Sequence, residues 1–123
     1  MGKVLLCALL EDNGRTMFLE HQMGETVCYS LPCVLADEKE NPIELLKKLV
    51  LQKTGIDAQI GLLALTGKHN AGSRRRKLFV NALCFVAKAK SFSTKTKVKW
   101  VALKEAGKLK LCRESEWLKN AGL

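Results

Sequence analysis

The chain has 123 residues, a length that suits one hydrophobic core, and we expect a single domain over residues 1–123. Its composition, 47% hydrophobic and 27% charged without a low-complexity tract, excludes a fibrous or largely disordered protein. The net charge is +9, and the charged residues are unevenly distributed along the chain. Residues 1–61 hold six Lys/Arg against nine Asp/Glu, and residues 62–123 hold fifteen against three. The excess of positive charge in the second half is typical of proteins that bind polyanions.

The N-terminal apolar run and the cysteines indicate where the protein works. The run over 4–10 is too short to span a bilayer, and no signal-peptide cleavage site follows it, so we expect a cytoplasmic protein with no membrane partner. The five cysteines are odd in number and contain no C-x-x-C, which favours neither a disulfide framework nor a zinc knuckle. Cys7 and Cys84 lie in apolar runs, where we expect buried free thiols in a reducing compartment.

The first elements in chain order are strands. The apolar run over 4–10 predicts a buried strand, and the Asn13-Gly14 turn joins it to a returning strand over 16–21, which makes a hairpin. A further strand is expected over 26–32, where Pro32 ends it. An acidic loop over 36–40 follows.

A helix over 42–54 has clear start and stop signals. Asn41 is a suitable N-cap, Pro42 fits the first helical position, and Glu44 is placed to complete a capping box. Apolar residues then recur at helical spacing until Gly55 ends the run.

The second half predicts more strands and a last helix. Strands are expected over 58–67, 77–89 and 97–103, with a basic loop over 68–76 between the first two. The segment 113–122 predicts a short helix, with Trp117 and Leu118 as core contacts. Strands, a helix, more strands and a final helix indicate an α+β fold with a mixed sheet.

The spacing around the helix resembles the Nudix (MutT-like) family. The family motif is G-x5-E-x7-R-E-U-x-E-E-x-G-U, with U a bulky aliphatic residue and often a Leu-Pro just before it. The matching positions here are Leu31-Pro32, Glu40, Lys48 in place of arginine, Val50 and Gly55-Ile56. The resemblance covers most of the chain and implies a Nudix-like α/β/α sandwich with a mixed β-sheet.

Most departures from the motif replace the residues that bind metal ions in the family. Val34 replaces the glycine, and Leu49, Gln52 and Lys53 replace the glutamates that hold divalent cations in the family. These three helix positions are three and four residues apart, so they are expected to share a face. A lysine there would repel Mg²⁺ by about 4 kcal/mol per unit-charge pair at about 4 Å. We therefore expect no metal and no cofactor at this degenerate site, and no catalytic residue can be assigned.

Other acids leave one alternative open. Glu40, the residual acid of the motif, lies with Asp37, Glu38 and Glu44 around the start of the helix, and Mg²⁺ often needs only one or two protein carboxylates. A rerouted metal site would give a divergent Nudix-type nucleoside diphosphate hydrolase, which would need Mg²⁺. The structural interpretation is that Glu44 caps the helix and local hydrogen bonds hold Glu40, and we favour it.

The basic loop is the main positive signal. Six residues of this segment are predicted to bind an anion. They are the consecutive cations Arg74, Arg75, Arg76 and Lys77, together with Lys68 and His69 upstream of them. A solvated hairpin tip would have the same composition, and His69 is then expected to be solvated or to contact phosphate. Five more lysines over 87–99 alternate with Phe92 and Trp100, which could stack on bases.

These observations predict a catalytically inactive Nudix-fold domain. We expect it to act as a binding module for an anionic ligand: a nucleotide, RNA or DNA, or an acidic partner protein. The divergent hydrolase is the alternative. A structural or interaction subunit, which binds a partner through apolar surface at Leu49, is the third interpretation. Nothing in the sequence indicates an oligomeric state.

Overall fold

The computed structural model describes residues 2–122, within which seven strands, one α-helix and two 3-10 helices follow one another. The strands are β1 (Lys3–Asp12), β2 (Arg15–Met23), β3 (Thr26–Ser30), β4 (Cys33–Asp37), β5 (Gln59–Asn70), β6 (Phe79–Lys88) and β7 (Val98–Val101). The helices are α1 (Pro42–Thr54), η1 (Leu103–Lys108) and η2 (Arg113–Asn120). None of the helices in this described part is long and apolar enough to cross a membrane.

The sheet is mixed, as the sequence predicts. Its main order is β3-β2-β1-β6-β5, with β4 on β1 and β7 on β2. Among the described strands, only β1 and β6 pair in parallel, from Val4 beside Asn81 to Leu10 beside Ala87, and the other pairs are antiparallel. The short strand β4 was not expected. It pairs five residues with β1, and its apolar residues Cys33, Val34 and Leu35 come directly after Pro32, where the preceding strand was expected to end.

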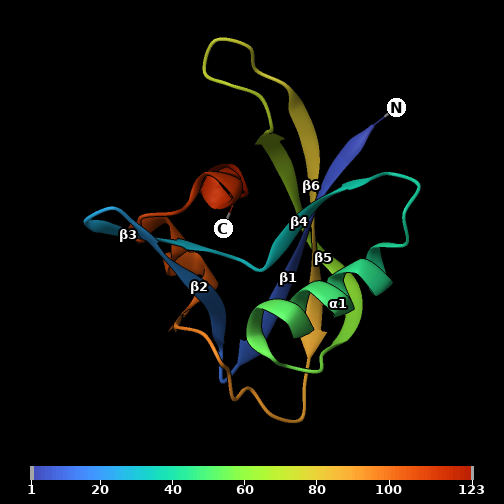
Figure 1. Ribbon diagram of the computed structural model, residues 1–123, viewed down its shortest axis with the longest axis vertical. Helices are drawn as coiled ribbons and strands as arrows, with labels where there is room; N and C mark the ends of the chain where they lie inside the picture. The colour runs from blue at the N-terminus through green and yellow to red at the C-terminus, as the bar shows by residue number, and fades with distance from the viewer. Residues whose placement is uncertain (1, 123) are drawn as a thin grey trace.

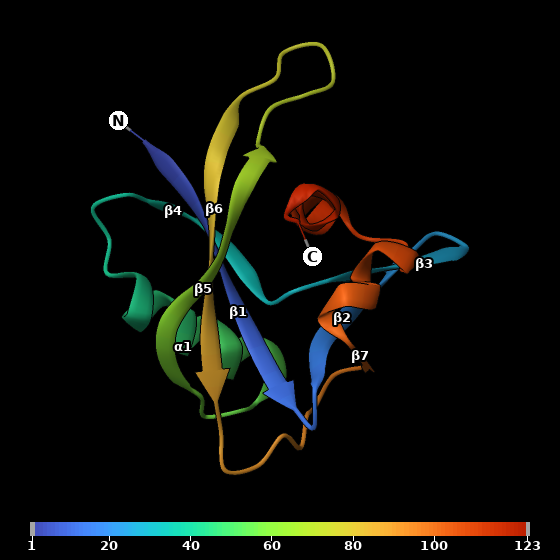
Figure 2. The same ribbon diagram turned by 180° about the vertical axis from the view of Figure 1, so that it is seen from behind.

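Both faces of β1 are covered. Its alternate residues Val4, Leu6, Ala8 and Leu10 pack in the core under α1, whereas Leu5, Cys7 and Leu9 pack in a second core with the C-terminal 3-10 helices. Figures 1 and 2 show α1 on one side of the sheet and η1 and η2 on the other. A central strand covered on both faces has no polar alternation, which is why its run of seven apolar residues is unbroken.

The ends of α1 follow the sequence signals. The Asn41 side-chain oxygen accepts hydrogen bonds from the Ile43 and Glu44 N–H groups at 3.0 and 3.3 Å. Gly55 ends the helix in the left-handed region, with φ 79°, and its N–H donates to the Leu51 carbonyl. The reciprocal half of the predicted capping box is absent: within residues 2–122 the Glu44 carboxylate makes no hydrogen bond to Asn41.

The C-terminal segment closes the second core, and Trp117 and Leu118 are buried there as predicted. Next to it, a disulfide joins Cys28 of β3 to Cys112, with 5.0 Å between the Cα atoms. The expectation that the cysteines form no disulfide is therefore wrong. The two residues are 84 positions apart in the sequence and meet because backbone hydrogen bonds join Tyr29 to Lys110 and Cys112. Cys7 and Cys84 are buried free thiols, as expected.

Candidate functional site

The degenerate motif positions Leu49, Gln52 and Lys53 lie three and four residues apart on the continuous helix α1, but they differ in burial. Leu49 is 8% exposed and packs in the core with Leu46 and Val50, whereas Gln52 and Lys53 are exposed to solvent. The three positions therefore do not offer a common solvent-exposed site, because Leu49 is in the core. The exposed apolar surface at Leu49, on which the interaction-subunit interpretation rested, is absent because this side chain is buried in the core.

The residual acids stabilise a turn. The Glu40 carboxylate accepts a hydrogen bond from the Asp37 N–H at 3.2 Å, and the Asp37 carboxylate accepts one from the Lys39 N–H at 3.0 Å. Glu38 and Glu40 also line a small cavity of about 210 Å³ beside Asn81. Within residues 2–122 these acids do not form a cluster of three ligands, and the one such cluster is His21, Cys112 and Glu114 on another part of the molecule.

The basic loop lies at the tip of the β5–β6 hairpin, at the top of Figure 1. Arg74, Arg75, Arg76 and Lys77 are all exposed, and none forms an ion pair with another described residue. The tip has its own hydrogen bonds. The Asn70 side-chain oxygen accepts from the N–H groups of Gly72 and Leu78 at 3.0 Å each, and Ser73 Oγ accepts from the Arg76 N–H at 2.8 Å. The four cations are thus carried on an ordered turn.

Lys68 and His69 lie at the end of β5 and not in the loop expected over 68–76. Lys68 is exposed and donates to the side-chain oxygen of Asn81 on the neighbouring strand. His69 is buried, with 9% exposure, so the expectation of a solvated loop histidine is wrong. Burial lowers the pKa of His69 and the Arg113 guanidinium lowers it further, which favours the neutral ring near pH 7. His69 therefore adds no charge to the basic tip.

The second basic segment lies at the opposite end of the molecule. It leaves the end of β6 and forms the orange loop at the bottom of Figure 1. The ten residues of β6 separate it from the hairpin tip, a length of about 30 Å at about 3.3 Å per residue. Phe92 and Trp100 are half-buried there, in an edge-to-face contact with ring centroids 5.5 Å apart. The two basic segments therefore do not form one continuous surface.

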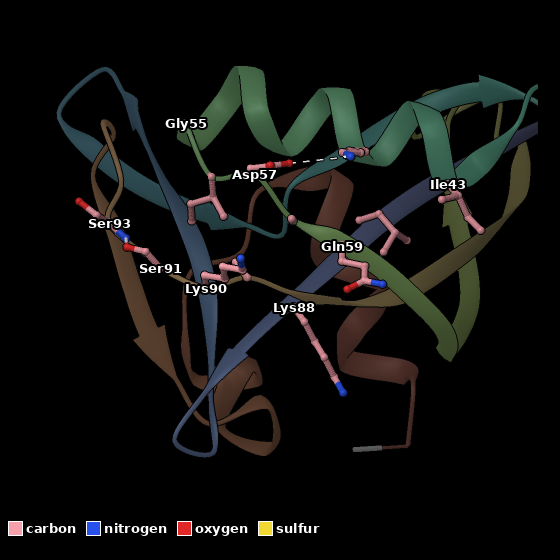
Figure 3. A pocket seen from close by; sticks show the side chains of 13 residues that line it. Ile43, Gly55, Asp57, Gln59, Lys88, Lys90, Ser91 and Ser93 are labelled. Atoms are coloured by element: carbon pink, nitrogen blue, oxygen red, sulfur yellow. Dashed lines mark hydrogen bonds and ion pairs between the residues drawn. The ribbon is translucent and has the colours of Figure 1, made fainter.

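A groove beside the second segment brings lysines to an apolar floor. It has a volume of about 1110 Å³ and runs between α1, the start of β5 and the end of β6 (Figure 3). Its floor includes Ile56, Ala58 and Ile60, which are nearly covered, and its rim carries Lys47, Lys88, Lys90, Asp57, Gln59, Ser91 and Ser93. No sequence pattern indicates this groove, because Lys47 and Lys88 come from elements far apart in the chain.

One acid lies among these lysines. Asp57 and Lys47 form an ion pair across the end of α1, drawn as the dashed line in Figure 3, with 3.9 Å between Nζ and Oδ1. Both side chains are more than half exposed, so solvent screens the pair and its contribution is small. Lys88 and Lys90 form no ion pair within the described residues. The rim therefore keeps a net positive charge that an anionic ligand could neutralise.

The three free thiols form a row, and the surroundings of Cys33 do not suit a nucleophile. Cys7 of β1 lies directly beside Cys33 of β4 on one side and Cys84 of β6 on the other. The hydrogen bond to Cys7, together with burial, holds the pKa of the Cys33 thiol well above its usual range. A thiol that stays protonated near pH 7 is a poor nucleophile and a poor metal ligand.

The layers and the sheet order are similar to those of several solved structures. A UDP-X diphosphatase superposes with a TM-score of 0.73 at 14% identity, over 97% of this chain and 59% of that one. An ADP-ribose pyrophosphatase from Streptococcus suis gives 0.68 at 12% identity, over 97% and 86%. The chain has the Nudix fold. A MutT protein from Methanosarcina mazei Go1 gives 0.62 at 16% identity, over 95% and 90% of the two chains. No protein-family model and no curated protein matches the chain.

Proposed function

We propose that this Nudix-fold domain is a binding module for an anionic, phosphate-bearing ligand and lacks Mg²⁺-dependent hydrolysis. The observation that carries the proposal is the chemistry of α1. Where the Nudix motif has metal-binding carboxylates, this helix has Leu49 in the core and Gln52 and Lys53 on the surface. A leucine and an amide offer no anionic ligand to Mg²⁺, and the ammonium group repels the ion.

The groove below α1 is the part of the surface that best suits such a ligand. Its floor offers contact to an apolar or aromatic group, and its rim offers the Lys88 and Lys90 ammonium groups and the Ser91 and Ser93 hydroxyls. Ligand sites commonly combine an apolar lining with a few polar groups that fix the orientation. A nucleotide has both complementary parts, a planar base and a charged phosphate. We therefore expect a nucleotide-like ligand in this groove.

The arginine-rich tip is a separate proposed anion contact. Arg74, Arg75, Arg76 and Lys77 are about 30 Å from the groove along β6, so a single nucleotide cannot reach both. A polyanion could contact the tip alone. Ordered cations without acidic partners among the described residues support this role, since they keep their full charge for phosphate.

The proposal is tested by nucleotide binding and by turnover, measured separately. A fluorescent nucleoside diphosphate should bind without Mg²⁺, and Lys88→Ala with Lys90→Ala should weaken binding about tenfold, as expected when a charge-assisted hydrogen bond is removed. Lys104→Ala with Lys119→Ala removes two exposed lysines that do not line the groove, and this control should bind normally. Equal weakening in both double variants would show only non-specific attraction.

The divergent hydrolase is the second candidate, since Glu38 and Glu40 line the cavity of about 210 Å³. Nucleoside diphosphate derivatives incubated with the protein and Mg²⁺ should give no turnover above background under our proposal. Turnover that rises with Mg²⁺ and disappears in Glu40→Gln would overturn the binding-module proposal in favour of this enzyme.

A further inference from the structure

Potential metal ligands gather around the Cys28–Cys112 disulfide. One ligand atom each from His21, Cys112 and Glu114 lies within 4.8 Å of the others, and Cys28 is bonded to Cys112. The four side chains come from β2, β3 and the start of η2, so three separate segments of the chain meet at this point. This cluster is on the C-terminal side of the sheet and shares no residue with the groove below α1.

The backbone places these side chains on a common surface. His21 and Cys28 are directly opposite each other on the antiparallel strands β2 and β3, so both side chains leave the same face of that hairpin. The Cys112 N–H donates to the carbonyl of Tyr29, the neighbour of Cys28, at 2.8 Å. Glu114 follows Cys112 by two residues in the first turn of η2. The backbone therefore fixes His21, Cys28 and Cys112 beside one another, and Glu114 reaches the same point from η2.

We propose that Cys28, Cys112, His21 and Glu114 bind Zn²⁺ when the disulfide is reduced. Two thiolates, one imidazole and one carboxylate are a ligand set that favours zinc over Mg²⁺ or Ca²⁺, which prefer oxygen ligands alone. Zn–S bonds of about 2.3 Å and Zn–N bonds of about 2.0 Å keep ligand atoms within about 4 Å of one another. The ligand atoms of His21, Cys112 and Glu114 already lie within 4.8 Å of one another, and reduction frees the Cys28 sulfur, which is bonded to Cys112, to complete the set. Four protein ligands leave no open position, so the site is structural.

The surroundings of His21 fit a metal ligand. A metal-binding histidine usually directs its second ring nitrogen to a hydrogen-bond partner that fixes the ring. His21 Nε2 lies 2.9 Å from the hydroxyl of Ser30, which is buried. Ser30 would therefore hold the imidazole in place while the other nitrogen faces the metal.

The disulfide and the zinc site exclude each other, because both use the same two sulfur atoms. A dithiol reductant breaks the Cys28–Cys112 bond, is itself oxidised to a disulfide, and passes two protons and two electrons to the two sulfurs. Zn²⁺ then displaces both thiol protons to solvent as it binds. In either state a cross-link joins the β2–β3 hairpin to the C-terminal segment.

The site is tested with Zn²⁺ itself on the full chain. The protein is reduced without oxygen by a water-soluble phosphine, which leaves as the phosphine oxide, and is then dialysed against Zn²⁺ and assayed for bound metal. One equivalent should be retained by the reduced protein and none by the oxidised protein. Zn²⁺ should also raise the thermal unfolding midpoint of the reduced protein, because a ligand that binds only the folded state stabilises it.

Variants assign the ligands. His21→Ala and Glu114→Gln leave the disulfide able to form, and each should weaken zinc binding, measured against a chromophoric chelator, about tenfold or more. Cys33→Ser removes a free thiol that is not among the four ligands and should bind zinc normally. A reduced protein that retains no zinc, or zinc binding that is insensitive to both His21→Ala and Glu114→Gln, or abolished in Cys33→Ser, would overturn the proposal. None of these outcomes depends on the groove or on nucleotide binding.

Discussion

The indole of Trp117 occupies the space into which a side chain at Gly67 would extend. A Cβ atom built on Gly67 would lie 2.4 Å from a ring carbon of Trp117, closer than any real packing contact. Trp117 is 5% exposed and connects η2 to β5, so this contact holds the C-terminal segment against the sheet. The absence of a side chain at position 67 is therefore a packing requirement of the second core.

Gly67→Ala should destabilise the domain by about 1 to 3 kcal/mol, the usual cost of forcing extra atoms into a packed core. Gly61→Ala on the same strand is the matched control, because its Cβ would meet only the Val86 carbonyl at 3.4 Å, an ordinary contact. Urea unfolding followed by tryptophan fluorescence measures both. Equal midpoints for the two variants would contradict the packing argument.

Much of this fold could be predicted because its signals are local. The hairpin turn at Asn13-Gly14 and the capped helix between Asn41 and Gly55 depend on neighbours in the sequence, and each is found where it was expected. Pairings between distant segments have no such local signal. The Cys28–Cys112 pair spans 84 residues and forms only because β3 pairs with the segment before η2.

The candidate site was harder to predict for the same reason. Helical spacing places Leu49 near Gln52 and Lys53, but only the sheet beneath α1 decides that Leu49 is covered and the others are not. The two basic segments follow each other closely in the sequence, yet β6 carries them to opposite ends of the molecule. Charge counts along the chain do not reveal that separation.

Leu49 provides a direct test of the altered helix face. Leu49→Glu, which restores the residue type of the Nudix motif, should destabilise the domain by more than the about 2 to 5 kcal/mol typical of Leu→Ala in a core, because an unpaired carboxylate is buried as well. Gln52→Glu and Lys53→Glu change exposed positions and should stay within about 0.5 kcal/mol of the parent. Thermal and urea unfolding of the three variants give the comparison. A stable Leu49→Glu protein would mean that this side chain is not in the core.

His69 should make the domain sensitive to acid. Its pKa in the folded state is lowered by burial and by Arg113, with Glu114 and Glu116 acting in the opposite direction. Below the ordinary histidine pKa of about 6.5, the unfolded chain therefore binds a proton that the folded chain does not, and the free energy of unfolding falls as the pH is lowered. His69→Gln cannot take up this proton, so its unfolding midpoint in urea should decrease less than that of the parent between pH 7.5 and pH 5.5. Parallel pH profiles for the two proteins would show that His69 titrates normally.

The arginine tip should bind polyanions independently of nucleotide binding in the groove. Each phosphate of duplex DNA that is no longer neutralised should reduce the slope of log affinity against log salt by about 0.9, through counterion release. Replacing Arg74, Arg75 and Arg76 together by Ala should therefore flatten the slope for a short duplex by up to about 2.7, and leave the unfolding midpoint unchanged because the tip is exposed. Nucleoside diphosphate affinity should not change in this triple variant, since β6 places the groove about 30 Å away.

DNA binding is measured at several salt concentrations for the parent, the arginine variant and the control Lys104→Ala with Lys119→Ala. The comparison separates phosphate binding by the tip from the effect of net charge. This control removes two exposed cations away from the tip, so its slope should stay close to that of the parent. An arginine variant whose slope is as steep as the parent's, or a control whose slope flattens as much as that of the arginine variant, would show that the tip does not bind phosphate.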